Sequence, residues 1–292
     1  MSNAPADDLG GFLRSRRARI QPRDVGLPAG DRRRVPGLRR EEVAQLAGVS
    51  VDYYVRLEQG RDLNVSDAVL DSVARVLRLD PTEHAHLRIL AHPPRDTAPA
   101  SSSRPGIQGL LDVIGAPAFV LGRCMDVLAW NARADAVMDF SRMERQARNM
   151  ARHAFLNPEA SAFYPDWEAV AAETAAHLRL DSARHPADRR LATMVAELSA
   201  ANPVFERLWT EHQVKEKSSG GKRLCHPLVG EFEVGYETLT VPGAPDLLIV
   251  VYTTETGSAA AAKLALLLDH AERKLLDHAE GTAGDRTRFQ TI

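Results

Sequence analysis

Cysteine is almost absent from this chain of 292 residues, which contains only Cys124 and Cys225. The two lie far apart and outside any CxxC or closely spaced His–Cys pattern, so neither a disulfide framework nor a metal site is indicated. The longest apolar run, Leu247 to Tyr252, is only long enough for a strand. No signal peptide or membrane-spanning segment is predicted, and we therefore expect a soluble, cytoplasmic protein that does not associate with membranes.

Recognisable catalytic motifs are also missing. The sequence has no GxSxG, HExxH, GxGxxG or P-loop, and no persuasive spacing of histidine and carboxylate residues. We therefore predict no catalytic residues, no enzymatic activity and no required cofactor.

The most informative stretch that is present runs from Leu38 to Gly60, LRREEVAQLAGVSVDYYVRLEQG. It reads as two short amphipathic helices around a tight turn. Gly48 suits the left-handed residue at the end of the first helix, and Ser50 suits the N-cap of the second. Tyr54 and Leu57 form a buried stripe on the second helix, whose other face stays polar. This is the pattern of a helix-turn-helix.

Charge is unevenly distributed around this motif. The net charge of the chain is -2, but Leu9 to Asp62 contains twelve arginines, seven acidic residues and no lysine, a net charge of +5 that leaves -7 for the rest. Arginine forks onto phosphate oxygens better than lysine. A basic segment joined to an acidic one is typical of a DNA-binding head with a separate sensing body.

The residues EEVAQLAGVS, the pair Tyr54 and Leu57, and the ending LEQG resemble the lambda-repressor-like, or XRE, class of helix-turn-helix domains. The resemblance implies an all-α head whose second motif helix lies in the DNA major groove. The alternative is a helical hairpin that only packs against protein.

By position in that class, Arg40 would meet phosphate, and Val51, Asp52 and Arg56 would face the base edges. Arg56 can bind guanine O6 and N7, Val51 a thymine methyl group and Asp52 a cytosine amino group, although Asp52 is equally explained as a charge in the first turn of its helix. Two heads on a palindromic operator are expected. The candidate DNA-binding residues are Arg39, Arg40, Ser50, Val51, Asp52, Tyr53, Arg56, Arg61 and Asn64. Arg32, Arg33 and Arg34 form either a phosphate-tracking arm or a solvated charge run.

The chain divides at a stretch rich in proline and serine. We predict a helix-turn-helix domain over residues 1–92, a linker over 93–105 and a second domain over 106–292. The predicted helices of the head are Leu9 to Ile20, the two motif helices, one capped by Ser66 and one from Asp80 to Ala91. The stretch Gln21 to Pro36 is predicted as a long loop.

The second domain mixes strands and helices. Strands are predicted at Ala118–Gly122, Asp126–Trp130, Lys222–His226, Glu231–Val241 and Leu247–Thr253. Helices are predicted at Gly106–Ile114, Asn131–Met138, Arg148–Leu156, Pro165–His185, Ala187–Ser199, Pro203–His212 and Ser258–His278. The predicted fold class is therefore α+β multidomain, in which the all-α head precedes an antiparallel sheet of about five strands with helices on one face.

Several segments of this domain carry a second resemblance. DVLAWNARADAVM, RNMARHAFLNPEA, FYPDWEAVA, ERLWTEHQV and HPLVGEFEVGYETLTVPG are similar to the ligand-binding domain of MmyB-like transcription regulators, which has a PAS-like fold. The resemblance implies a homodimeric regulator that binds double-stranded DNA and holds a small apolar ligand, with a fatty acid as the precedent in the family.

Candidate ligand-binding residues follow from the same reading. Aromatic residues would form the walls of an apolar cavity, and a few polar groups would meet the ligand's head, although aromatic residues at this spacing more often belong to the core and helix capping alone explains Asn131. The candidates are Trp130, Asn131, Arg148, Phe155, Tyr164, Trp167 and Tyr236.

Two other classes of protein use the same features. One is a protein-interaction adaptor without a ligand, and the other is an enzyme with a regulatory DNA-binding head. Mass spectrometry of ligand extracted from the purified protein separates a sensor from an adaptor, and turnover screening detects an enzyme. The sequence names neither the ligand, the operator nor the direction of the ligand's effect on DNA binding.

Overall fold

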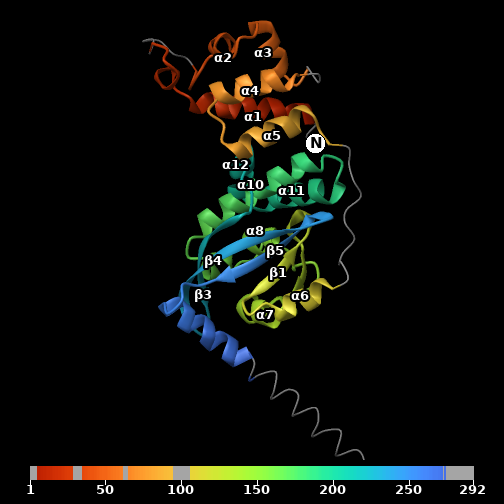
Figure 1. Ribbon diagram of the computed structural model, residues 1–292, viewed down its shortest axis with the longest axis vertical. Helices are drawn as coiled ribbons and strands as arrows, with labels where there is room; N and C mark the ends of the chain where they lie inside the picture. Colours follow the sequence, from red (N-terminus) through yellow and green to blue (C-terminus); the bar gives the residue numbers. More distant parts are fainter. Residues whose placement is uncertain (1–4, 29–34, 62–64, 95–105, 272, 274–292) are drawn as a thin grey trace, which may run out of the picture. The chain divides into compact units, whose positions relative to one another are not determined.

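The structure is a computed structural model and describes residues 5–28, 35–61, 65–94, 106–271 and 273. These residues form two compact units, which are treated separately below: Met1–Ala98 with Ala172–Glu216 (unit 1), and Pro99–Ala171 with Lys217–Ile292 (unit 2). Unit 1 is helical and unit 2 is built on a sheet (Figure 1), so the predicted α+β fold class is confirmed. None of the helices in the described ranges is long and apolar enough to cross a membrane.

Unit 1 contains the predicted head. Its helices are α1 (Pro5–Arg19), the 3-10 helix η1 (Pro22–Val25), α2 (Arg40–Ala47), α3 (Val51–Glu58), α4 (Asp67–Val76), α5 (Pro81–Ala91), α11 (Arg189–Ala201), α12 (Pro203–Thr210) and most of α10 (Trp167–Arg184). The five predicted head helices are all present. Only η1 was not predicted; it is a short turn within the stretch expected to be a loop.

The core of unit 1 extends beyond the head. It is formed by apolar side chains of α1 to α5, including the fully buried Phe12, Tyr54 and Leu57, and it also takes in Ala183 of α10 and Val214. Helices from the middle of the predicted second domain therefore belong to the same compact unit as the helix-turn-helix.

Unit 2 is organised around a sheet. Its strands are β1 (Ala118–Leu121), β2 (Val127–Trp130), β3 (Ser219–His226), β4 (Gly230–Val241) and β5 (Ala244–Thr253), and its helices are α6 (Ile107–Val113), η2 (Arg123–Met125), α7 (Ala132–Met138), η3 (Phe140–Arg142), α8 (Met150–Phe155) and α9 (Ala160–Phe163). Within the described residues, the five strands pair antiparallel in the order β2-β1-β5-β4-β3. The first two strands thus join the last three through β1 and β5.

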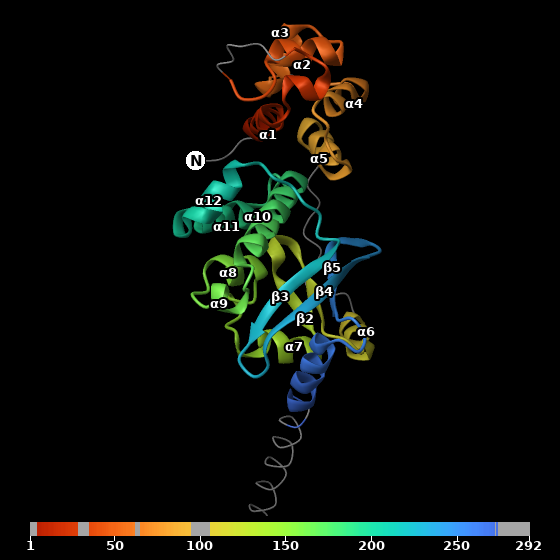
Figure 2. The same ribbon diagram turned by 90° about the vertical axis from the view of Figure 1, so that its left-hand side faces the viewer.

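Helices lie against both faces of this sheet (Figure 2). On one face, α6 packs its Ile107 and Leu111 against β1 and β5. On the other face, which we call the inner face, α8 and α9 cover β3 (Figure 2). The prediction of helices on a single face was therefore incomplete, because the apolar residues of α6 also need a surface on which to be buried.

The last predicted helix and the predicted linker are only partly described by the structure. Residues 259–271 and 273 are helical, and the remainder of the helix predicted to reach His278 lies outside the described residues. Of the predicted linker, Pro93 and Pro94 are described and 95–105 are not.

Candidate functional site

The helix-turn-helix has the local geometry that its sequence requires. Gly48 ends α2 with a φ of 72°, in the left-handed region where a side chain would be strained. Ser50 caps α3, since its Oγ accepts a hydrogen bond from the amide of Tyr53 at 3.1 Å. Tyr54 and Leu57 are fully buried. The outer side of α3 is thereby left for a partner.

The outer side of α3 carries one arginine in a defined environment. The Arg56 side chain is 51% exposed, and its Nε lies 3.7 Å from Oδ2 of Asp52, whose own side chain is 82% exposed. The Arg56 guanidinium also lies 5.9 Å from the centre of the Tyr53 ring. Val51, at 47% exposed, is a neighbour on the same helix. Asp52 and Tyr53 therefore orient Arg56, and this pairing accounts for Asp52 without a contact to a base.

The two arginines at the start of α2 differ in their partners. Arg40 donates from Nε to Oε1 of Glu58 at 2.8 Å, and Arg17 of α1 donates from Nε to Oε2 of the same carboxylate at 2.9 Å. Glu58 is fully buried. Burial acts to lower the pKa of Arg17, but the hydrogen bond and charge of Glu58 outweigh it, so this pKa is raised. Arg39 is half-exposed and pairs with Glu41 at 3.4 Å.

Glu58 was not predicted as important, although it ties α1, α2 and α3 together. An acid inside an arginine-rich stretch is a usable sequence signal, because a buried carboxylate needs cationic partners. Of the remaining candidates for DNA binding, Arg61 is exposed. Asn64 and the run Arg32 to Arg34 lie outside the described residues.

Two buried arginines join α1 to helices that are far away in the sequence. Arg179 of α10 donates from Nη1 to Oδ1 of Asp8 at 2.9 Å. Arg16 of α1 donates from Nη2 to the carbonyl oxygen of His212 at 2.7 Å, and its Nε lies 2.7 Å from Oε1 of Glu83. Burial lowers the pKa of Arg16 to about 10, against the opposing effect of Glu83. The sequence could not predict these contacts because they have no local pattern.

Six of the seven candidate ligand-binding residues fall into three places within unit 2. Trp130 lies against Phe140 and beneath the Arg148 guanidinium, which is 5.1 Å from the centre of the Trp130 ring. Phe155 and Trp167 contact each other edge to face, with ring centres 6.2 Å apart. Tyr164 and Tyr236 are buried, and they belong to the two layers that meet at the inner face of the sheet.

The two polar candidates are already engaged with the backbone. Asn131 caps α7 by accepting from the Ala134 amide at 2.8 Å, and its amide donates to the carbonyl of Ala116 at 2.8 Å. Arg148 donates from Nε to the carbonyl oxygens of Phe140 at 3.0 Å and Met143 at 3.1 Å. These bonds give both residues a structural role, and their contact with a ligand stays a prediction.

Three side chains that the sequence did not single out stand beside the buried tyrosines. Lys222 of β3 is only 7% exposed, and its Nζ lies 5.1 Å from the centre of the Tyr236 ring. His153 of α8 packs edge to face on Tyr164, with ring centres 5.6 Å apart. Tyr252 of β5 is the register partner of Tyr236. A lysine in the buried alternation of a strand was the available signal, since lysine is seldom buried without a partner.

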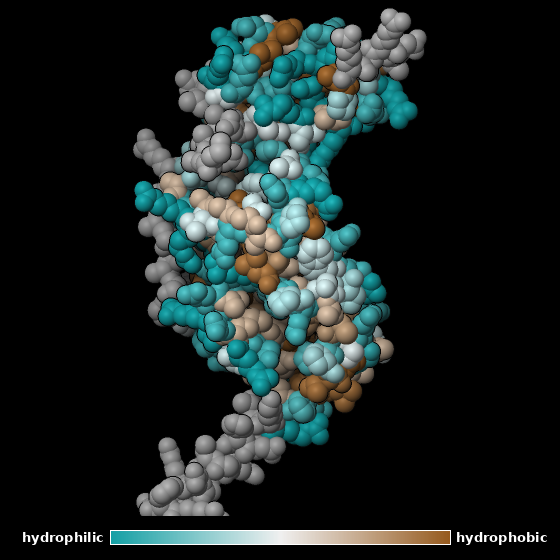
Figure 3. Space-filling model, turned by 180° about the vertical axis from the view of Figure 1, so that it is seen from behind, coloured by the Kyte–Doolittle hydropathy of each residue, from teal (hydrophilic) through white to brown (hydrophobic). Residues whose placement is uncertain are grey.

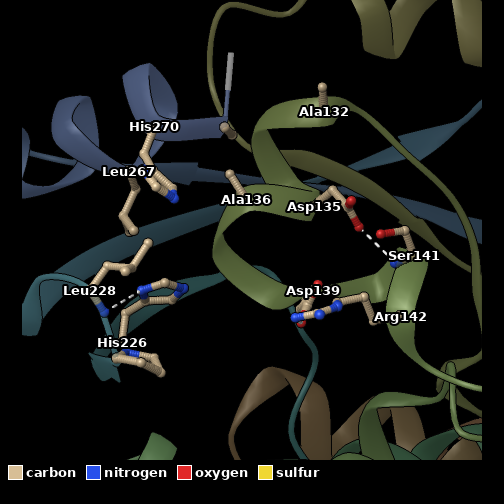
Figure 4. A pocket seen from close by; sticks show the side chains of 12 residues that line it. Ala132, Asp135, Ala136, Asp139, Ser141, Arg142, His226, Leu228, Leu267 and His270 are labelled. Carbon is tan, nitrogen blue, oxygen red and sulfur yellow. Dashed lines mark hydrogen bonds and ion pairs between the residues drawn. The ribbon is translucent and has the colours of Figure 1, made fainter. Parts of the chain in front are cut away.

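Unit 2 also has an open pocket of about 580 Å³, shown in Figure 4. It lies between α7, η3, the turn after β3 and the helix 259–271, and none of the predicted ligand residues lines it. Four of its polar side chains have partners in the protein. Asp135 accepts from the Ser141 amide at 2.7 Å, His226 accepts from the Leu228 amide at 3.2 Å, and Arg142 pairs with Asp139 at 3.5 Å.

Comparison with known families agrees with both parts of the chain. Residues 8–87 match the model of a helix-turn-helix domain, and residues 103–267 match the model of the MmyB-like transcription regulator ligand binding domain. No curated protein matches the chain. Because the ligand-binding-domain match alone covers more than half of its length, the chain belongs to the MmyB-like transcription regulators, and it is a DNA-binding regulator with a ligand-sensing domain.

Proposed function

We propose that the protein is a homodimeric, cytoplasmic regulator, without enzymatic activity or a required cofactor, that reads a palindromic operator through α3. The observation that carries this proposal is the outward Arg56, held between Asp52 and Tyr53 next to the exposed Val51. A guanidinium oriented in this way can meet O6 and N7 of one guanine. The mainly hydrophilic surface of the head, visible at the top of Figure 3, suits a polar, charged partner.

A single head makes few phosphate contacts, and this is the reason to propose a dimer. Two heads related by two-fold symmetry would read half-sites about one helical turn apart, and the second head would raise affinity without new chemistry. Arg39, Arg40 and Arg61 are the phosphate contacts we propose on each head.

The sensing part of the proposal concerns the inner face of the sheet. We infer that a small apolar ligand, with a fatty acid as the leading example, lies among the buried aromatic side chains there, including Tyr164 and Tyr236. We propose that ligand occupancy in unit 2 biases DNA binding.

The test of DNA binding uses the full-length protein. Fluorescence anisotropy with labelled duplexes from beside its own gene, at low ionic strength, should give saturable binding that weakens steeply as salt is added. Arg56→Ala should weaken binding, whereas Arg207→Ala, which removes an exposed arginine from α12, should not. Absence of binding to any duplex would overturn the proposal.

The test of sensing is independent of the operator. Protein purified under native conditions is extracted with organic solvent, and the extract is examined by mass spectrometry for a stoichiometric apolar compound. Adding that compound back should change the anisotropy titration. An extract without such a compound, together with unchanged DNA binding in the presence of fatty acids, would favour a ligand-free adaptor.

A further inference from the structure

One buried carboxylate in the helix-turn-helix is shared by two arginines. Glu58, the last residue of α3, is fully buried. Its Oε2 accepts a hydrogen bond from Nε of Arg17 at 2.9 Å. Its Oε1 accepts from Nη2 of Arg17 at 3.1 Å and from Nε of Arg40 at 2.8 Å. Arg17 belongs to α1 and Arg40 is the first residue of α2, so three helices meet at this carboxylate.

Arg17 is engaged almost entirely inside the protein. Its third nitrogen, Nη1, donates to the carbonyl oxygen of Leu38 at 2.7 Å, so each nitrogen of the guanidinium has an acceptor. The side chain is only 13% exposed. A buried carboxylate needs a cationic partner, and Arg17 supplies it from within the fold.

Arg40 is held by the same carboxylate but faces outward. Its side chain is 44% exposed, and among the described residues only its Nε makes a hydrogen bond. Its Nη1 and Nη2 are left at the end of the guanidinium, where two parallel N–H groups fit two oxygens of a phosphate. Two guanidinium charges against one carboxylate charge leave +1 in this group, so Glu58 does not cancel the charge of Arg40.

The hydrogen bond to Glu58 also restricts how Arg40 can move. A long side chain loses rotamer freedom when it binds a partner, and this loss is smaller for a side chain that is already held. The neighbouring Arg39 is not held in this way. Its partner, Oε1 of Glu41, lies 3.4 Å away and both side chains are largely in solvent, where an ion pair does little to fix geometry.

We propose that Glu58 is a positioning residue for DNA binding: through Nε of Arg40 it directs the two Nη atoms of that guanidinium at one backbone phosphate, while Arg17 balances the charge of the carboxylate. The inference rests on the proposed phosphate contact of Arg40. It adds a buried residue that touches no DNA and yet sets the geometry of that contact.

The first test uses a variant that should keep the fold. Arg40→Lys leaves a cation beside Glu58, but one ammonium group cannot hold the carboxylate and also present a planar pair of donors to a phosphate. Full-length protein is titrated by anisotropy with the duplex that the wild type binds best, at several salt concentrations. The variant should bind several-fold more weakly, and the slope of log affinity against log salt should fall by about one.

The second test removes the charge of the positioning residue. Glu58→Gln should also weaken binding several-fold and lower the slope by about one, because Arg40 is no longer directed at the phosphate. Glu41→Gln is the matched control, since it removes the exposed acid of the other arginine pair. It should keep the wild-type slope. Circular dichroism of each variant identifies a temperature at which all of them are folded.

A double variant distinguishes positioning from a general effect on structure. If Glu58 acts on DNA binding through Arg40, then Glu58→Gln should change neither affinity nor slope further once Arg40→Ala is present. A residue that only supports the fold would instead weaken binding by the same factor in both backgrounds. Should Glu58→Gln fail to fold, Arg40→Lys decides alone.

Three outcomes would overturn the assignment. A wild-type salt slope in Arg40→Lys would show that only the charge of Arg40 matters. A wild-type slope in Glu58→Gln, or additive losses in the double variant, would leave Glu58 with a structural role only. Absence of binding by the wild-type protein to any duplex would remove the proposed function itself, and the role of Glu58 with it.

Discussion

The Arg179 guanidinium donates to the Asp8 carboxylate, and this bond joins a helix of the ligand-binding-domain match to the first helix of the helix-turn-helix match. Arg179 also donates to the carbonyl oxygen of Trp209 and lies 4.0 Å from the centre of its ring. Burial lowers the pKa of Arg179, against the raising effect of Asp8. Removing either partner therefore leaves a charge in a largely buried place.

We predict that Asp8→Asn destabilises unit 1 by about 3 kcal/mol, because it leaves the buried Arg179 cation without its counter-ion. Hydrogen exchange of the full-length protein, followed in peptides of α1 and α10, measures the change. The double variant with Arg179→Met should be less destabilised than the sum of the single variants, because the two residues interact directly. Additive effects would indicate that the ion pair contributes nothing.

A second prediction concerns two histidines beside these arginines. Burial, followed by the charges of Arg179 and Arg16, lowers the pKa of both His86 and His212 to about 3. The unfolded chain binds these protons near pH 6.5 and the folded chain does not, so their contribution is fully present above pH 6.5 and is lost as pH falls from 6.5 towards 3. His86 should cost about 2 kcal/mol of stability by pH 5, and the less buried His212 should cost less because solvent screens its charge.

Urea unfolding at pH 7.5, 6 and 5 checks this dependence on acid. His86→Leu should flatten the loss between pH 7.5 and 5 by about 2 kcal/mol, since the unfolded variant no longer takes up that proton. His92→Leu is the control, because His92 is exposed at the end of α5. Equal slopes in wild type and His86→Leu would contradict the prediction.

Local sequence signals were sufficient to predict the helices of the head and the helices and strands of unit 2. Gly48, Ser50 and Asp80 act within three or four residues, so their sequence context already fixed the helix ends that the structure displays. The strands were also predicted, since alternating apolar residues are a local pattern. Their order in the sheet was not, because the pairing of β1 with β5 joins segments more than a hundred residues apart.

The candidate ligand site was only partly predictable for the same physical reason. Aromatic residues such as Tyr164 and Tyr236 attract attention in any sequence, and both are buried beside the inner face. Lys222 alternates with the buried residues of its strand, but only the covering helices show that its side chain is itself buried. Arg148 was predicted to bind the ligand because its side chain is charged. Its hydrogen bonds to the carbonyl oxygens of Phe140 and Met143 depend instead on the path of the chain through η3.

Arg148 is therefore the subject of a third prediction. Arg148→Ala should lower the stability of unit 2 by about 1–3 kcal/mol, because the carbonyl oxygens of Phe140 and Met143 lose a charged donor. We expect this variant, at a temperature where it is folded, still to bind the apolar compound extracted from the wild-type protein. Calorimetry with that compound decides; loss of binding would assign the ligand's head to Arg148, as the sequence predicts.

The fourth prediction separates two arginines of the helix-turn-helix that both face a partner. Arg56→Ala should change stability by less than about 0.5 kcal/mol, because its ion pair with Asp52 is exposed. It should cost about 1–3 kcal/mol of binding at one base pair of the operator and relax the preference there. Arg40→Ala should weaken every operator alike and also lower stability by about 1–2 kcal/mol, because the buried Glu58 keeps only Arg17.

A panel of operators with single base-pair changes, titrated at one salt concentration, distinguishes these two effects. Urea unfolding of each variant, measured alongside, separates lost contacts from lost structure, and Arg207→Ala serves as the exposed arginine away from the motif. A uniform loss across the panel for Arg56→Ala would remove it from the base-reading set. The outward side of α3 would then contribute only through phosphates, and specificity would have to come from the shape of the DNA.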